Sequence, residues 1–369
     1  ATSIGRSIAG NMKPLYDYME GYNGDQMADE LNMQSKHSIE KQAAHRVDCF
    51  TTVSEITDRE CAQLLEKKAD VITVNGFEDD FVPKGAAFTA KRKEARKVML
   101  NVASKLLGQE FADDTIIVST GGRYEFRNKG IDILLESLKR LAAEPTLDRD
   151  VLAFINVPAW VKGPRVDLVE RLQMKDESNS QLSTFNSQLS TPVISHELYN
   201  MDDDKALSMM RAIGLDNNAN SRVKVIFVPC YLNGNDGIFN MPYYDLLPGD
   251  DLAVYPSYYE PWGYTPLESV AFHVPTITTD LAGFGLWANS IKGEYSQLED
   301  GVKVVHRTDS NWDEAADEIK NTILAFTKMD AKLVTQLRRR ASDIAKKALW
   351  DKFMKYYLEA YDIALSKVK

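Results

Sequence analysis

The residues of this chain best suited to chemistry lie between Leu252 and Glu268, in the stretch Leu-Ala-Val-Tyr-Pro-Ser-Tyr-Tyr-Glu-Pro-Trp-Gly-Tyr-Thr-Pro-Leu-Glu. It holds one carboxylate, Glu260, in a loop that is predicted to join a strand to a helix. Loops in that position are where open α/β sheets bind ligands, and free amides at a helix start can take an anion such as phosphate. The aromatic residues around the carboxylate are Tyr258, Tyr259, Trp262 and Tyr264.

Local signals define both ends of this loop. Residues 252–255 form a short apolar run stopped by Pro256, which predicts a buried strand. Thr265 is a suitable N-cap, Pro266 suits the first helical position, and Glu268 falls at the third, so a capping box is predicted. Such boxes are structural in most proteins, and loop aromatics often only cover a core. A purely structural role therefore remains the alternative.

A second loop, Gly121-Gly-Arg-Tyr-Glu-Phe-Arg-Asn-Lys-Gly130, lies between another predicted strand and helix. Arg123 offers a planar fork to an anion and Lys129 a point charge, while the flanking glycines let the backbone approach closely. Solvated surface cations are the alternative. The chain has no Gly-Lys-Ser/Thr phosphate loop and no Gly-x-Gly-x-x-Gly after a strand, so the pattern indicates anion binding without either common motif.

The elements that must position these loops alternate between strand and helix, which predicts an α/β fold with doubly wound parallel sheets. Residues 1–30 contain several glycines and are expected to be irregular. Strands are expected at 48–54, 69–74, 115–120, 151–157, 223–228, 252–255, 276–279 and 302–305, and helices at 33–45, 55–68, 91–107 and 131–141, with a mostly helical segment at 313–369.

Three units are predicted from this pattern. Residues 1–113 form the remainder of a first Rossmann-like domain, and residues 114–328 form a second, ligand-binding one. The C-terminal helices, 329–369, are expected to pack back on the first domain. The segment Asn-Ser-Gln-Leu-Ser-Thr occurs at 179–184 and again at 186–191, and it is expected to be a mobile insertion without chemistry.

Composition limits the possible functions. The 369 residues are 44% hydrophobic and 27% charged, as in ordinary globular proteins. A net charge of −10 argues against a general nucleic-acid or membrane surface. The three cysteines, Cys49, Cys61 and Cys230, suggest neither a disulfide framework nor a metal motif. Without an apolar run of spanning length or a signal peptide, the protein is expected to be cytoplasmic.

Several motifs resemble those of glycogen synthases of the animal and fungal type, and they occur in the family's order. Besides the two loops above, they are Phe50-Thr-Thr-Val-Ser54, Arg222-Val-Lys-Val-Ile-Phe227 and Gly283-Phe-Gly285. The resemblance implies a retaining glucosyltransferase of the two-Rossmann-domain GT-B architecture. Such enzymes transfer glucose from UDP-glucose to the non-reducing end of an α-1,4-glucan, and no cofactor is expected.

The resemblance also implies roles for single residues. Arg123, Lys129 and Arg6 match the cations that hold the diphosphate, and Glu260 matches the carboxylate beside the transferred glucose. The predicted donor contacts also include Trp262, the helix start from Gly263 through Tyr264 to Thr265, the ribose-binding Glu268, and a uracil-stacking Tyr243, with Tyr244 as the alternative. Fixed cations and helix amides can stabilise the departing diphosphate without a metal, and a carboxylate can stabilise the oxocarbenium-like sugar. Front-face departure and attack is favoured over a covalent intermediate.

Two departures from the family bear on activity and control. The match begins at Ala1, which predicts a fragment lacking about one Rossmann half-domain, with weak or no activity. Only Arg338, Arg339 and Arg340 correspond to the cluster that binds glucose-6-phosphate, and a solvated helix face is expected there. The segment 162–193 is also shorter than the family's tetramer-building insertion, so the form of any homo-oligomer is left open. The alternatives are a nucleotide-sugar or glycan-binding module without catalysis, and a glucan synthase that uses ADP-glucose.

Overall fold

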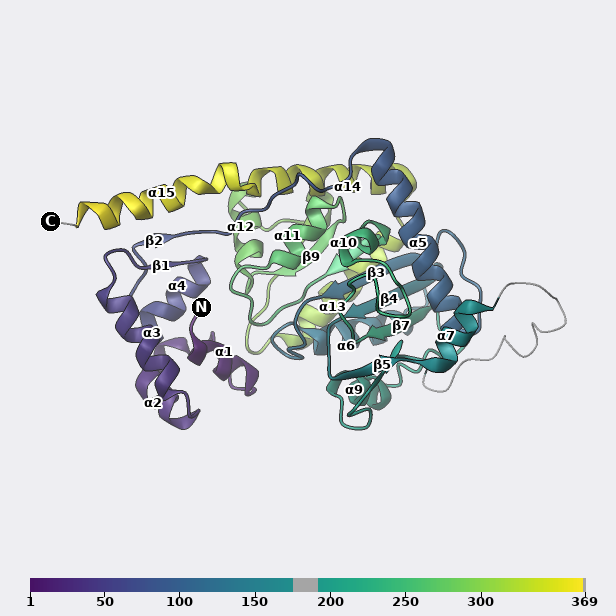
Figure 1. The fold of residues 1–369 in the computed structure, drawn as a ribbon, viewed down its shortest axis with the longest axis horizontal. Coiled ribbons are helices and arrows are strands. Elements are labelled where there is room, and N and C mark those ends of the chain that lie inside the picture. Colours follow the sequence, from purple (N-terminus) through teal and green to yellow (C-terminus); the bar gives the residue numbers. More distant parts are fainter. Residues whose placement is uncertain (175–191, 368–369) are drawn as a thin grey trace.

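A computed structural model of the chain describes residues 1–174 and 192–367. Its larger part is built on a six-stranded sheet with the order β10-β9-β8-β3-β4-β7, and all neighbouring strands are parallel (Figure 1). Such a sheet is the doubly wound arrangement expected from the sequence. The repeated segment within 179–191 lies outside the described residues. The strands of this sheet are β3 (Ile116–Gly121), β4 (Val151–Asn156), β7 (Val223–Val228), β8 (Leu252–Val254), β9 (Thr276–Thr279) and β10 (Val302–Val305).

Helices cover both faces of the sheet, which is why its strands are continuous apolar runs rather than alternating ones. Side chains of one strand point alternately to the two faces. Ile117 and Leu152 pack with α5 and α7, whereas Ile116 and Val151 pack with α6, α9 and α13. The helices of this part are α5 (Gly85–Leu107), α6 (Ile131–Ala142), α7 (Val166–Gln173), α9 (Lys205–Ile213), α10 (Tyr243–Leu246), α11 (Tyr264–Ala271), α12 (Gly283–Lys292) and α13 (Trp312–Thr327), with short 3-10 turns η2 (Leu247–Gly249) and η3 (Leu298–Asp300). A small antiparallel ribbon, β5 (Val161–Pro164) with β6 (His196–Leu198), lies beside β7.

The order of the strands reverses between β3 and β8. From β3 the chain adds β4 and then β7 on one side, and it later adds β8, β9 and β10 on the other. The loops that follow β3 and β8 therefore leave the sheet in opposite directions and open a crevice at its carboxyl edge. Both loops singled out in the sequence, 121–130 and 255–263, lie at this switch point.

The smaller part comprises the first 77 or so residues, with a two-stranded parallel sheet of β1 (Thr51–Thr52) and β2 (Val71–Ile72). The expectation that residues 1–30 are irregular is wrong, because two helices form there. Thr2 caps the first by accepting from the amide of Gly5, and Asn23 caps the second by accepting from that of Gln26. The helices of this part are α1 (Ser3–Gly10), η1 (Met19–Gly21), α2 (Gly24–Glu30), α3 (Gln34–Arg46) and α4 (Glu55–Leu64).

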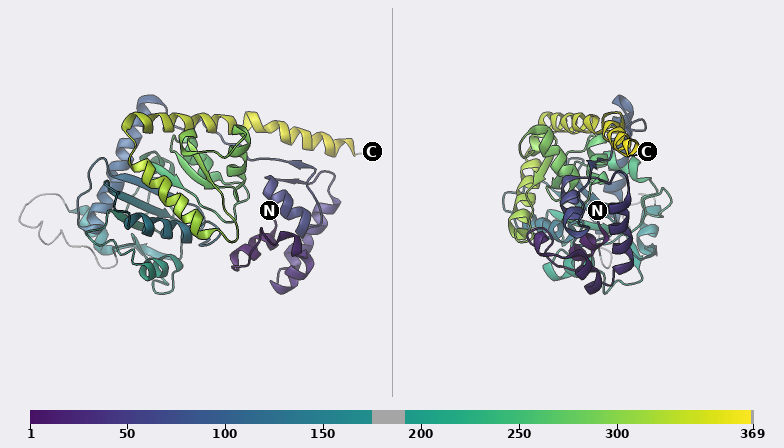
Figure 2. Two further views of the ribbon diagram at one scale, coloured as in Figure 1. Left: turned by 180° about the vertical axis from the view of Figure 1, so that it is seen from behind. Right: turned by 90° about the vertical axis from the view of Figure 1, so that its left-hand side faces the viewer.

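The C-terminal helices connect the two parts (Figure 2). Helix α14 (Ala331–Ala345) packs against α11, and after the turn η4 (Lys346–Ala348), α15 (Trp350–Ser366) runs alongside β2. Backbone pairing joins Phe77 to Leu349, and the hydroxyl of Tyr357 donates to the carbonyl of Thr73 at 3.3 Å. The proposed limits of the three units remain a prediction.

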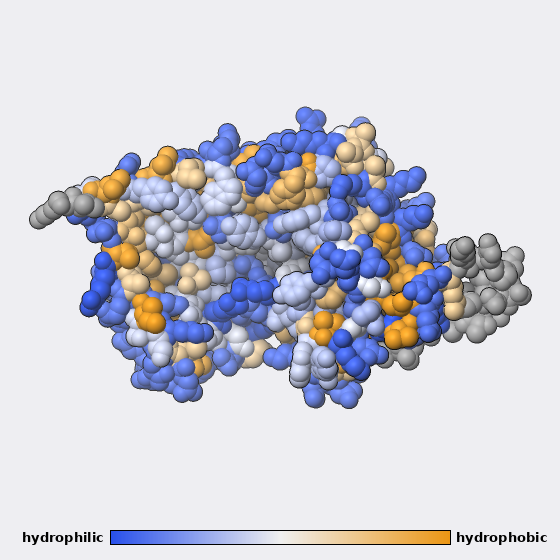
Figure 3. Space-filling model, viewed as in Figure 1, coloured by the Kyte–Doolittle hydropathy of each residue, from blue (hydrophilic) through white to orange (hydrophobic). Residues whose placement is uncertain are grey.

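Figure 3 shows a hollow between the two parts, with hydrophilic residues along its lower edge. Within the part of the chain that the structure describes, no helix combines the length and the apolar character needed to cross a bilayer.

Candidate active site

The two loops at the switch point lie against each other. The carbonyl of Asn128 accepts hydrogen bonds from the amides of both Tyr258 and Tyr259, each at 3.0 Å. Gly130 follows with a φ of 69°, and a Cβ atom there would lie 2.0 Å from the carbonyl oxygen of Pro256. Only glycine allows both the backbone conformation and this approach.

This contact brings together Lys129 and Glu260, which are predicted to act on the diphosphate and the sugar. Their Nζ and Oε2 atoms form an ion pair, and both side chains are largely buried. A carboxylate and an ammonium group held side by side can stabilise the opposite charges that develop on the two halves of a substrate when the bond between these halves breaks. The pair is therefore suited to a reaction that separates charge.

Two other sequence motifs support the loop that carries Glu260. The amide of Gly283 donates to the carbonyl of Glu260 at 3.2 Å. The hydroxyl of Ser54, which also caps α4, donates to the carbonyl of Pro261 at 2.7 Å. A Cβ atom on Gly283 would lie 2.4 Å from that same carbonyl, so the glycine is needed where the two parts of the molecule meet.

The predicted capping box at the start of α11 is wrong. The helix begins at Tyr264, and its N-cap is Gly263 with a φ of 109° and no side-chain cap. The positive φ turns the chain into the helix two residues earlier than a cap at Thr265 would. The carboxylate of Glu268 instead accepts from the hydroxyl of Tyr244 at 2.9 Å. Because no side chain caps the first amides of α11, they can bind an anion.

A cavity of about 600 Å³ opens at the carboxyl ends of β3, β4 and β7. Three of the predicted site residues, Arg123, Tyr243 and Thr265, line it together with Gly122, Tyr124, Asn156, Pro158, Cys230, Tyr231, Leu232 and Asn233. Asn156 and the segment 230–233 were not predicted, although their position at or shortly after the carboxyl ends of two buried strands was a usable signal. Burial holds the pKa of Tyr243 well above its ordinary value, so its ring is neutral.

Trp262 and Tyr264 lie differently from the other predicted residues. The indole of Trp262 is buried in an aromatic cluster with Phe284, Trp287 and Phe353. Its side chain therefore packs in the core, and its carbonyl accepts a hydrogen bond from the amide of Phe284 at 2.7 Å. Tyr264 is exposed.

Arg6 reaches the same region from α1. It forms an ion pair with Glu125 of the 121–130 loop, and Arg123 Nε lies 3.2 Å from Glu125 Oε1. Burial pushes the pKa of Glu125 upward, but the hydrogen bonds from Arg6 and Asn128 outweigh this effect and leave the pKa below its usual value. Glu125 was not predicted, although it stands in the same loop as Arg123.

The expectation of a solvated face at Arg338 is wrong. Its guanidinium donates to the carbonyls of His273 at 3.1 Å and Asp250 at 2.7 Å, and it pairs with Asp251. Arg92 and Arg96 of α5 pair with the same carboxylate, so Arg338 is part of a buried network that joins α14, α5 and the sheet. Arg339 and Arg340 are exposed, as expected.

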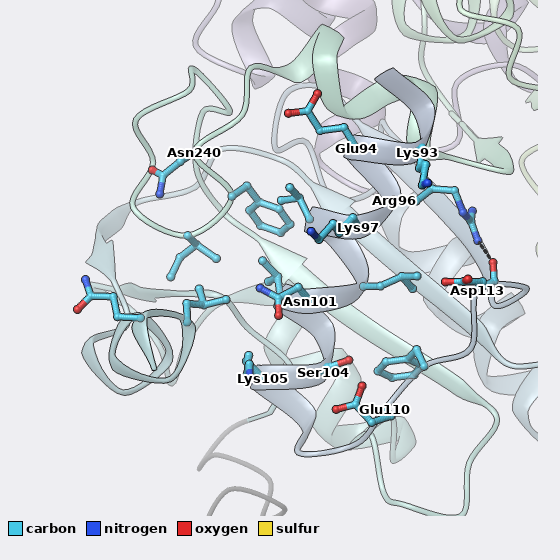
Figure 4. A pocket seen from close by; sticks show the side chains of 18 of the residues that line it. Lys93, Glu94, Arg96, Lys97, Asn101, Ser104, Lys105, Glu110, Asp113 and Asn240 are labelled. Carbon is cyan, nitrogen blue, oxygen red and sulfur yellow. Dashed lines mark hydrogen bonds between the residues drawn. The ribbon is translucent and has the colours of Figure 1, made fainter. Parts of the chain in front are cut away.

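A hollow larger than this cavity, about 1260 Å³, lies elsewhere, along α5 (Figure 4). Lys93, Lys97 and Asn101 of this helix border it, and Glu110 lies across the following turn. None of the predicted site residues borders this hollow. Its charged groups are spread along the helix rather than converging on one point (Figure 4).

Two groups of potential metal ligands exist within the described ranges, His196 with Cys230 and Asp236, and the acidic run 78–80. In the first group His196 Nε2 is hydrogen-bonded to the backbone carbonyl of Asp236 at 3.0 Å. The carboxylate of Asp236 accepts from the amides at positions 238, 239 and 240. These hydrogen bonds occupy the side chains of His196 and Asp236. That the donor site works without a metal ion stays a prediction.

A parallel sheet wound in both directions, with ligand loops at its switch point and a second part across the crevice, is the architecture of GT-B glycosyltransferases. Solved structures agree with this class. A glycosyltransferase from Rickettsia africae superimposes with a TM-score of 0.51 at 12% identity, covering 89% of this chain and 67% of that one. Anabaena HepE in complex with UDP-glucose gives a TM-score of 0.51 at 14% identity, covering 90% and 68%.

Sequence comparison specifies the family. The model of the glycogen synthase family matches residues 1–175 and 167–369, so the chain belongs to that family. Glycogen [starch] synthase of Neurospora crassa is 29% identical over 422 residues, and the human liver protein is 28% identical over 415. The match covers 100% of this chain but only 59% and 58% of these relatives.

Proposed function

We propose that this chain carries the donor site of a glycogen synthase that transfers glucose from UDP-glucose to the non-reducing end of an α-1,4-glucan, with retention. The observation that carries the proposal is the contact between the two switch-point loops. It places the Lys129–Glu260 pair near Arg123 and the uncapped start of α11. The solved structures of HepE include complexes with UDP and with UDP-glucose, which supports the choice of donor.

The proposed chemistry follows from the charges of these residues. As the bond between the sugar and UDP breaks, negative charge develops on the diphosphate, where Arg123, Arg6 and Lys129 supply positive charge. The amides at the start of α11 add the positive end of a helix dipole. Glu260 stabilises the oxocarbenium-like sugar on the other side of the breaking bond. These groups make transfer without a metal ion feasible, and we propose that the protein works in the cytoplasm.

Calorimetric titration with UDP, ADP and uridine, in the presence of EDTA, tests the donor site. We expect UDP to bind more tightly than ADP, and Arg123→Ala to weaken UDP binding by about tenfold while leaving uridine binding unchanged. Arg222→Ala, which removes an exposed arginine paired with Asp150 outside the site, is the control. Tighter binding of ADP would favour an ADP-glucose-using synthase, and equal weakening of UDP and uridine by Arg123→Ala would refute the diphosphate role.

A second experiment separates catalysis from binding alone. In a protein of the relatives' full length, Glu260→Gln should abolish glucosyl transfer while UDP binding persists, because the carboxylate acts on the sugar rather than on the nucleotide. Loss of both together would assign Glu260 a structural role. Retained transfer would show that another group stabilises the sugar.

A further inference from the structure

The carboxylate of Glu125 lies between two arginines that come from different parts of the molecule. Arg6 Nε donates to Oε2 at 3.1 Å and its Nη2 pairs with Oε1, while Arg123 Nε lies 3.2 Å from Oε1. Asn128 Nδ2 donates to Oε2 at 3.2 Å. Both carboxylate oxygens are therefore occupied by donors.

The anchoring of these groups is unequal. Glu125 belongs to a loop whose backbone is fixed, since the amide of Lys129 donates to its carbonyl at 2.8 Å and its own amide donates to the carbonyl of Arg123 at 2.8 Å. Its side chain is 19% exposed, whereas those of Arg6 and Arg123 are 43% and 64% exposed. Glu125 is therefore the more firmly held partner, and its carboxylate orients the two more exposed guanidinium groups.

A carboxylate presents two acceptor oxygens to a guanidinium in the same way as a phosphate does. The cations Arg6, Arg123 and Lys129 face the carboxylates Glu125 and Glu260, so these five side chains together carry a net charge of about +1. A diphosphate brings at least two negative charges. It gains full ion pairs with both arginines only if Glu125 gives them up.

We infer that Glu125 is a competitor built into the site: its carboxylate holds Arg6 and Arg123 while the site is empty, and a diphosphate must displace it from at least one of them. Glu125 thereby lowers the affinity for the diphosphate and does not affect the binding of the uracil base. This inference rests on the proposed function, which assigns both arginines to the diphosphate.

The test compares Glu125→Gln with the parent chain in calorimetric titrations with inorganic pyrophosphate, UDP and uridine. Glutamine keeps the shape of the side chain and a carbonyl for Asn128, but it releases the arginines from a charged partner. Because these ion pairs are partly exposed, we expect pyrophosphate and UDP to bind about fivefold more tightly, with uridine unchanged. Glu144→Gln, which disrupts an ion pair with Lys320 outside the site, should change none of the three affinities.

The possible results separate the inference from the proposed function. Unchanged or weaker binding of pyrophosphate and UDP to Glu125→Gln overturns the competition, even if the parent chain binds UDP well. Tighter pyrophosphate binding without any binding of uridine or preference for UDP supports the competition and overturns the proposed donor. Failure of both proteins to bind pyrophosphate overturns the inference, because arginines freed from Glu125 should hold it. Thermal unfolding of the unliganded variant shows whether the fold is intact.

Discussion

The contact between the two switch-point loops can be tested at Gly130. Replacing this glycine by alanine introduces two costs. The first is the left-handed backbone, with a φ of 69°, which costs an alanine about 1 kcal/mol. The second is the position of the new methyl group, which would lie 2.0 Å from the carbonyl oxygen of Pro256.

The second cost is large because the carbonyl cannot move freely. It accepts a hydrogen bond from the guanidinium of Arg307, which is buried. Moving the carbonyl aside overpacks the contact between the two loops, which costs about 1–3 kcal/mol. It also weakens the buried hydrogen bond from Arg307, which costs about another 1–3 kcal/mol, the value of a hydrogen bond to a charged group. We therefore expect Gly130→Ala to lower the free energy of unfolding by about 3–7 kcal/mol in total.

Gly214 provides a matched control. It ends α9 with a φ of 70°, nearly the same as that of Gly130, but a Cβ atom there would meet only Lys139 Nζ at 3.5 Å. Gly214→Ala should therefore cost about 1 kcal/mol. Urea unfolding of both variants isolates the cost of the loop contact, and calorimetry should show UDP binding weakened by at least about tenfold in Gly130→Ala alone. Losses of stability equal within about 0.5 kcal/mol would refute the argument that the carbonyl of Pro256 confines Gly130.

Two further predictions concern the supports of the site. Burial, with a contribution from Asp251, raises the pKa of Asp250 from an ordinary value of 3.8 to about 7. Protonated Asp250 therefore stabilises the folded state below about pH 4, and this stabilisation is lost as the pH rises to about 7. In the parent chain the free energy of unfolding should fall by at most about 4 kcal/mol between pH 4 and pH 7, and Asp250→Asn should abolish this fall. Urea unfolding at several pH values measures it. If the free energy of unfolding of Asp250→Asn depends on pH as steeply as that of the parent chain, Asp250 is not the source. Ser54→Ala should lower the free energy of unfolding by about 2 kcal/mol in the same assay, because it removes both a helix cap and the hydrogen bond to Pro261. Asp330→Ala removes a helix cap alone and should cost about 1 kcal/mol. Equal costs would mean that the hydrogen bond to Pro261 does not stabilise the fold.

The elements with strong local signals could be predicted from the sequence. The apolar runs of the parallel sheet fix its strands to within a residue or two, because strands buried on both faces have few alternatives. The start of the helix predicted at 55–68 was also correct, since a serine directly before a helical pattern is a local signal. The helices within residues 1–30 were missed, because glycines and polar residues concealed two caps and two short buried faces.

Errors at the site came from contacts that are distant in sequence. Thr265, Pro266 and Glu268 fit a capping box locally, but Glu268 is engaged by Tyr244, 24 residues earlier, and Gly263 turns the chain first. Arg338 has the composition of a solvated helix face, yet it pairs with Asp251, 87 residues away. A charged side chain is assigned correctly only when its partner is known, and sequence spacing does not supply partners across a fold.

The same limit explains why Glu125 passed unnoticed beside Arg123. In sequence the cations of an anion site can be recognised, because arginine and lysine carry donors suited to an anion and neighbouring glycines let the backbone approach one. The carboxylates that balance them cannot, because an acidic residue in a loop is ordinary on any surface. Cations held close together without a ligand repel each other, so a site built from Arg6, Arg123 and Lys129 requires nearby acids to be stable when no ligand is bound. Those acids reduce the affinity for the ligand by the same interaction through which they stabilise the empty site, and the balance between the two effects is a property of the folded arrangement alone.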